Sequence, residues 1–110
     1  MARKATQAPR LGATDQDVNA LVERFQNHLR FSQGEAWSTA QPYDHFVSLA
    51  LAVRDQIVDR MIATQHTYHE RGVKRVYYLS LEYLLGRLLR NNLTCLGLYD
   101  DCQRRLAELG

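Results

Sequence analysis

Long apolar runs, paired cysteines and a strong net charge are all missing from this 110-residue chain. No apolar stretch approaches the ~18 residues that span a bilayer, and the N-terminus has no apolar core of a secretion signal. The formal net charge of +2 is too small to indicate nucleic acid or an acidic membrane surface as a partner. We therefore expect a soluble protein that binds neither.

The cysteine and histidine spacings do not form any known metal motif. Cys95 and Cys102 do not make a C-x-x-C pair, and no second pair completes a zinc site. A direct bond between them along one helix is geometrically poor, so we expect free thiols in a reducing cytosol and a cytoplasmic protein. The H-x-x-H-E spacing of His66, His69 and Glu70 is not a zinc-protease motif, and we predict no metal site.

Apolar periodicity predicts helices over most of the chain. Residues 1–14 lack this periodicity and contain no acidic residue, so we expect a solvated tail. Thr14 is the expected cap of a first helix, Asp17 completes an acidic variant of the capping box, and the helix should fade near Phe31. Its apolar residues recur at steps of three and four and so share one stripe: Val18, Leu21, Val22, Phe25 and Leu29.

A second, longer helix is predicted from Asp44, as its cap, to Arg71. Gly72 suits the left-handed position that ends helices, and Arg71 suits the negative end of the helix dipole. The apolar residues that keep the helical period are Phe46, Leu49, Ala50, Val53, Ile57, Met61 and Ile62. Two shorter helices should follow, one starting near residues 86–87 and one over residues 99–109.

The segment between the second and third helices has a different pattern. Val76, Tyr77, Tyr78 and Leu79 form a continuous apolar run of β-favouring residues, which predicts a strand buried on both faces. Such a strand needs neighbouring strands to pair with its N–H and C=O groups. This chain offers no second convincing strand, so those partners should come from more sequence or another molecule. The predicted fold class is mainly α with one buried strand.

The end of this predicted strand carries the candidate site residues. Open α/β sheets bind ligands at the carboxyl ends of their strands, and the chain places an acid, an aromatic residue and an arginine there. Glu82 beside an apolar strand needs a partner, which is either Arg87 or a ligand. A structural Glu82–Arg87 pair and a role in a cleft both stay open. The candidate cleft residues are Glu82, Tyr83, Leu84, Gly86 and Arg87.

Residues 74–87, Lys-Arg-Val-Tyr-Tyr-Leu-Ser-Leu-Glu-Tyr-Leu-Leu-Gly-Arg, resemble the segment that opens the first sheet of glycogen and starch phosphorylases. Further similar stretches are 53–55, 59–60, 64–65, 88–93 and 96–100, the last two being similar to bacterial and plant members in particular. The resemblance is dense over residues 46–102, about half of the chain, and is absent before Asp15.

The resemblance implies an α-glucan phosphorylase with two Rossmann-like domains, of the GT-B type, around a deep cleft. Such an enzyme uses orthophosphate to cleave terminal α-1,4-glucosidic bonds of glycogen, starch or maltodextrin, releasing glucose 1-phosphate, and a homodimer is expected. Pyridoxal phosphate is held by a lysine of the C-terminal domain, and that lysine and a glycine-rich turn lie beyond Gly110. We therefore expect no catalytic or cofactor-binding residue in this segment and no activity from it alone. The alternative is a stand-alone, non-enzymatic helical remnant or interaction module.

Three residues depart from the animal members of the resembled family. Those enzymes bind an activating nucleotide with a tryptophan and a tyrosine on the second helix, where Met61 and His69 stand here. Leu84 replaces a tyrosine that contacts the cofactor, as in the bacterial branch, and no serine precedes Ser32. The resemblance thus implies an unregulated, bacterial-type enzyme. Its expected divisions are 1–14 as a tail, 15–72 as an N-terminal helical hairpin and 73–110 as the start of an α/β domain.

Overall fold

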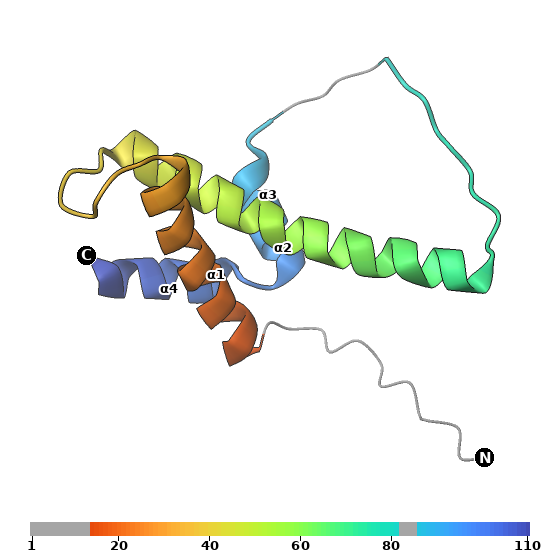
Figure 1. Cartoon of the computed structure of the whole chain (residues 1–110), viewed down its shortest axis with the longest axis horizontal. Helices are drawn as coiled ribbons and strands as arrows, with labels where there is room; N and C mark the ends of the chain where they lie inside the picture. Colours follow the sequence, from red (N-terminus) through yellow and green to blue (C-terminus); the bar gives the residue numbers. More distant parts are fainter. Residues whose placement is uncertain (1–13, 82–85) are drawn as a thin grey trace.

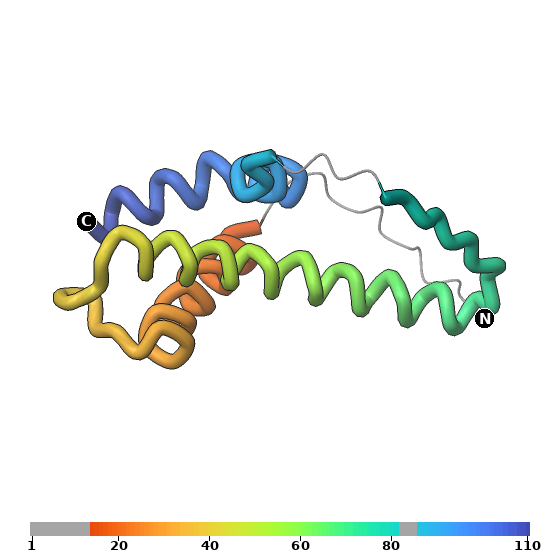
Figure 2. The backbone as a smooth tube through the Cα atoms, turned by 90° about the horizontal axis from the view of Figure 1, so that it is seen from above, coloured from red at the N-terminus to blue at the C-terminus, as the bar shows by residue number. Residues whose placement is uncertain are grey.

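Four α-helices and one π-helical turn occur among the residues that the structure describes (Figure 1). The computed structural model describes residues 14–81 and 86–110. The elements are α1 (Asp15–Asn27), η1 (His28–Ser32), α2 (Pro42–Arg71), α3 (Leu88–Leu96) and α4 (Tyr99–Leu109). Helices α1 and α3 both pack on α2, and α4 packs on α1 and α3 (Figures 1 and 2). The described residues are therefore mainly helical, as the sequence predicts.

Helix α1 begins with the capping box that the sequence predicts. The Thr14 N–H donates to the Asp17 carboxylate at 2.9 Å, and the Asp17 N–H donates to the Thr14 hydroxyl at 3.2 Å. The Thr14 N–H thereby gains an acceptor, and the Asp17 N–H gains a second one beside the Thr14 carbonyl, which lies 2.9 Å away. The α-helix ends at Asn27, but η1 continues the helical backbone to Ser32, close to the expected end near Phe31.

Helix α2 begins earlier than predicted. Its N-cap is Gln41, not Asp44, because Pro42 occupies the first helical position, where a missing N–H costs nothing. Asp44 lies in the first turn instead, and its carboxylate accepts the Gln41 N–H at 2.8 Å. The predicted C-terminus is confirmed: Gly72 has φ 57°, and the helix ends at Arg71.

The buried core joins α1, the first half of α2, α3 and the start of α4. The predicted stripe of α1 is confirmed at four of its five positions, Val18, Leu21, Phe25 and Leu29. Of the apolar residues that keep the helical period in α2, Val53 is buried and Leu49 packs against the core, whereas Phe46, Met61 and Ile62 are each more than half exposed. The other buried residues of α2 are small or polar, namely Ser48, Ala52 and Gln56. Small side chains let two helix backbones approach closely, which apolar periodicity alone does not reveal.

Both buried polar residues of α2 find partners. The Ser48 hydroxyl donates to the Asp44 carbonyl of the preceding turn at 2.7 Å. The Gln56 amide donates to the Asp17 carbonyl at 3.3 Å and so links α2 to the first turn of α1. Their burial therefore leaves no amide or hydroxyl group unpaired.

The second half of α2 and the segment after it extend away from this core (Figures 1 and 2). The radius of gyration is 17.3 Å, whereas a compact domain of this length has ~13 Å. None of residues 59–71 of α2 is buried, and residues 73–81 are all exposed. The chain thus combines a small packed helical bundle with an exposed extended segment, residues 73–81, which we call the arm.

The predicted buried strand is not seen. Val76, Tyr77, Tyr78 and Leu79 are between 77% and 93% exposed, and no strand occurs among residues 14–81 and 86–110. Residues 74–79 make no backbone hydrogen bond to any other described residue. A β-strand exists only through pairing, and the described residues supply no second strand to pair with.

A search of the same described residues for a membrane span gives a negative result, since none of their helices combines the necessary length with an apolar composition.

Candidate functional site

Only part of the predicted site lies within the described structure. Glu82, Tyr83 and Leu84 fall outside the described residues. Gly86 is exposed, with nothing near the position that a Cβ atom would take. Arg87 is exposed at the N-cap position of α3, in an extended conformation (φ −78°, ψ 97°), and its side chain makes no capping hydrogen bond. The pairing of Glu82 with Arg87 therefore stays a prediction.

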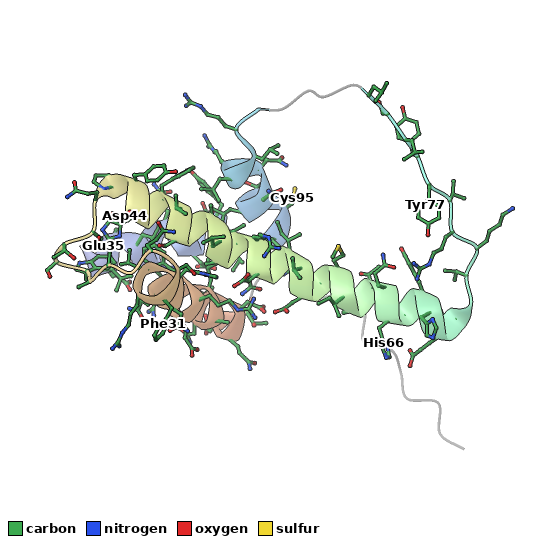
Figure 3. All side chains as sticks on the ribbon, turned by 45° about the horizontal axis from the view of Figure 1, so that its top comes forward. Phe31, Glu35, Asp44, His66, Tyr77 and Cys95 are labelled. Atoms are coloured by element: carbon green, nitrogen blue, oxygen red, sulfur yellow. The ribbon has the colours of Figure 1, made fainter. Side chains whose placement is uncertain are left out.

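The arm leading to this site forms an open hollow with the end of α2. The hollow has a volume of about 410 Å³ and lies between Gln65 and Tyr68 of α2 and the segment that carries Lys74, Arg75 and Tyr77. Figure 3 shows Tyr77 on the extended arm, well apart from His66 of α2. The wall formed by residues 74–79 makes no backbone hydrogen bond to another described residue, so no such bond fixes the shape of this hollow.

The second half of α2 carries the residues that the sequence singles out for metal and nucleotide binding. Met61 and His69 are exposed, so their side chains are accessible. His66 Nδ1 lies 3.5 Å from Glu70 Oε2, and both side chains are more than 60% exposed, so this contact contributes little stability. Among residues 14–81 and 86–110, no three side chains of metal-binding type come together.

His28 joins η1 to α2 and makes two side-chain hydrogen bonds, which we call the histidine relay and which no sequence pattern predicts. His28 Nε2 lies 2.7 Å from the Asp55 carboxylate, and His28 Nδ1 lies 2.8 Å from the Ser32 hydroxyl. A carboxylate only accepts, so Nε2–H donates to Asp55, and in the neutral ring Nδ1 accepts from Ser32. The spacing of four between His28 and Ser32 is a local signal, but Asp55 comes from another helix. The relay fixes the π-helical turn to α2.

An aromatic cluster connects α1, the loop after η1 and the first turns of α2. Trp37, in the loop between η1 and α2, has its ring centroid 4.7 Å from that of His45 and 6.1 Å from that of Phe25. Both neighbouring rings meet the indole at steep angles, 65° and 82°. The indole stays 43% exposed and borders a cavity of about 660 Å³.

Two ionisable groups have shifted pKa values. The backbone N–H and then the hydroxyl of Thr14 hold the pKa of Asp17 below its ordinary value. Burial raises the pKa of the Cys102 thiol, which keeps it protonated and unreactive at neutral pH. Cys95 is exposed, and both thiols are free, as predicted.

The curated proteins to which this chain is similar include glycogen phosphorylases from several mammals. No protein-family model matches the chain. It is 44% identical over 94 residues to the brain form of glycogen phosphorylase from Homo sapiens, and equally so to that from Rattus norvegicus. It is 43% identical over 95 residues to the liver form from Bos taurus. Each match covers 86% of this chain and only 11% of the relative, and the matching part is the N-terminal one.

Proposed function

Because the chain corresponds to an N-terminal segment of a glycogen phosphorylase, we propose that the intact protein is an α-glucan phosphorylase. It would cleave terminal α-1,4-glucosidic bonds with orthophosphate and release glucose 1-phosphate. The observation that carries the proposal is 44% identity over 86% of the chain. The alternative, a stand-alone helical remnant or interaction module, is not favoured, because nothing in the similarity points to it.

Within such an enzyme, this chain would supply the N-terminal helices and the first strand of a GT-B-type α/β domain. The exposed apolar arm supports this role. Side chains such as Tyr78 (88% exposed) and Leu79 (93% exposed) lose hydrophobic stabilisation in water, and their backbone groups make no hydrogen bond to another described residue. Strands supplied by the rest of the protein would correct both deficits. The corresponding divisions are 1–14 as a tail, 15–72 as a helical hairpin and 73–110 as the start of the domain.

The cofactor of the proposed enzyme is pyridoxal phosphate, and the residues of this chain do not fit its attachment. The chain has two lysines, Lys4 and Lys74, and Lys74 is exposed on the unpaired arm. A lysine that forms a Schiff base is held in a desolvated pocket, whereas Lys74 is exposed to water. We therefore place no catalytic or cofactor-binding residue here, and we propose a cytoplasmic homodimer whose other segments hold the cofactor.

Regulation of the intact enzyme should differ from that of the animal relatives. A thioether at Met61 and an imidazole at His69 give adenine poorer stacking surfaces than an indole and a phenol ring. A chimeric phosphorylase, in which this chain replaces the matching segment of the human brain enzyme, allows a test. We expect AMP to activate the parent enzyme but not the chimera, and several-fold activation of the chimera would contradict the bacterial-type assignment.

The sequence that follows Gly110 in the gene tests the proposed function. We expect the reading frame to continue through the glycine-rich turn Gly-Asn-Gly-Gly-Leu-Gly-Arg and then to a cofactor-binding lysine. A stop codon directly after Gly110 would instead favour the helical remnant.

A further inference from the structure

The histidine relay has the order of groups found in catalytic triads, namely a carboxylate, an imidazole and a hydroxyl. His28 Nε2 lies 2.7 Å from Asp55 Oδ2, and His28 Nδ1 lies 2.8 Å from the Ser32 hydroxyl. Both distances fall within the ~2.6–3.2 Å over which a base can take a proton from a nucleophile. Such a constellation is recognised by its geometry, and the proposed phosphorolysis does not use these three residues.

The charges around Asp55 leave its bond to His28 undisturbed. The second carboxylate oxygen, Oδ1, lies 3.8 Å from Arg54 Nη1, so the arginine does not compete for the oxygen that His28 uses. With the Nε2 proton directed to Asp55, the lone pair of Nδ1 in the neutral ring accepts from the Ser32 hydroxyl. This arrangement lets Nδ1 take the hydroxyl proton while Asp55 stabilises the imidazolium that forms.

The three side chains of the relay differ in exposure as a surface nucleophile requires. The His28 and Asp55 side chains are 22% and 33% exposed, whereas Ser32 is exposed at the last position of η1. π-helical turns are rare and occur frequently at functional sites, and this one begins at the base and ends at the hydroxyl. A reagent can therefore reach the Ser32 oxygen from solvent while the base stays bound to Asp55.

The open setting of Ser32 limits the substrates that its hydroxyl can attack. Stabilisation of an oxyanion is strongest in a water-excluded site, and an exposed hydroxyl lacks that shielding. An amide has a poor leaving group and needs such stabilisation, whereas the leaving group of a thioester departs as a stable thiolate. The geometry thus fits an activated acyl donor and not a peptide.

We infer that Ser32 is an acylation site for thioester donors, with His28 as the base and Asp55 as the residue that positions it. In this step Ser32 Oγ attacks the thioester carbonyl, so that a C–O bond forms and the C–S bond breaks. The hydroxyl proton passes to His28 Nδ1 and then to the leaving thiolate, and the products are a serine ester and a thiol. Nothing is oxidised or reduced, and the inference does not rest on the proposed phosphorolysis.

The test is reaction of the 110-residue chain with phenyl thioacetate, followed by peptide mass spectrometry that locates the acetyl group. Cys95→Ala is present throughout, because an exposed thiol would exchange with the thioester. We expect acetylation at Ser32 and much slower acetylation at Ser38, an exposed serine of the following loop that lies outside the relay. Unfolding the chain in urea should abolish this preference, because the relay depends on the contact between η1 and α2.

Two variants distinguish a base from a purely structural contact. His28→Gln keeps a side chain that hydrogen-bonds but is not a base, so it should slow Ser32 acetylation by about 100-fold, the lower end of general-base effects. Asp55→Asn should slow the reaction as well, and circular dichroism of both variants shows whether the helices remain. Ser38→Ala is the matched control and should leave the rate at Ser32 unchanged.

Equal acetylation of Ser32 and Ser38 in the folded chain would overturn the inference, however the variants fold. An unchanged Ser32 rate in folded His28→Gln would do the same, because the relay would then only fix the π-helical turn to α2. Neither result bears on phosphorolysis by the chimeric phosphorylase, so the inference can fail while the proposed function stands.

Discussion

At the scale of single residues, Thr14 and Asp17 show how a short motif determines a local structure. Three hydrogen bonds that involve a side chain join them, and one of these links the Thr14 hydroxyl to the Asp17 carboxylate at 2.8 Å. The motif is predictable because all of its members lie within four residues. The His28–Asp55 contact spans 27 residues and two elements, so no local pattern could have revealed it.

Replacing Thr14 with alanine should destabilise the chain by about 1 kcal/mol, the usual cost of losing an N-cap side chain. Thr64→Ala is the matched control, because the Thr64 hydroxyl bonds only to the Arg60 carbonyl within α2, and alanine favours the helix interior. Urea unfolding followed by circular dichroism measures both variants. Equal destabilisation by the two substitutions would contradict the capping role.

The same motif gives a dependence on pH. The pKa of Asp17 is lowered in the folded chain by hydrogen bonds from Thr14, so its stabilising effect is present above the pKa of the unfolded chain. This contribution is lost as the pH falls through the lowered folded-state pKa. Asp17→Asn should therefore make the free energy of unfolding fall less steeply as the pH is lowered. An equally steep fall in the variant would show that the pKa of Asp17 is not the cause of the pH dependence.

Glu82 and Arg87 are predicted to serve the cleft of the intact enzyme more than its stability. In the chimeric phosphorylase, Glu82→Gln and Arg87→Lys should reduce turnover by about 10- to 100-fold, the equivalent of ~1.5–3 kcal/mol for a hydrogen bond to a charged group. The melting temperature should change little. Unaltered turnover with a lowered melting temperature would instead identify the pair as a clamp between strand and helix.

At the scale of elements, the helix ends were more predictable than the faces that helices bury. Tyr99–Leu109 forms the last helix as expected, and Gly72 ends α2 as expected. The buried face of α2 escaped prediction, because Ser48 and Gln56 are polar. Their hydrogen-bond acceptors are the Asp44 carbonyl of the preceding turn of α2 and the Asp17 carbonyl of α1, and apolar periodicity reveals neither. The strand over Val76–Leu79 has suitable residues but no partner among the described ones, so local preference alone does not form it.

The difference in burial between the helices and the arm predicts a large loss of stability at one leucine and a small one at another. Leu21 is 2% exposed between the helices, so Leu21→Ala should destabilise the chain by about 2–5 kcal/mol. Leu79 is 93% exposed on the arm, so the same substitution there should change the stability by no more than ~0.5 kcal/mol. Urea unfolding of the two variants makes the comparison. A cost at Leu79 similar to that at Leu21 would show that the arm packs against the bundle.

At the scale of the whole molecule, the helical bundle and the arm differ in burial and in hydrogen bonding. The bundle has a buried core, and its buried Ser48 and Gln56 side chains are hydrogen-bonded, whereas the arm leaves apolar side chains and backbone groups in water. The similarity to the N-terminal 11% of glycogen phosphorylases accounts for this difference, because the arm would be completed by the remainder of such an enzyme. The mainly helical class and the similarity to glycogen phosphorylases could be inferred from the sequence. The predicted buried strand is not seen, because it needs pairing partners that no local pattern supplies.

The release of glucose 1-phosphate from maltoheptaose and orthophosphate, assayed for the isolated chain and for the chimeric phosphorylase, tests the central claim most directly. The isolated chain should release none, because it holds neither the glycine-rich turn nor the cofactor lysine of the resembled family. The chimera should bind pyridoxal phosphate and carry out phosphorolysis at a rate comparable to that of its human parent. A folded, cofactor-loaded chimera without activity, or release of glucose 1-phosphate by the isolated chain, would contradict the account.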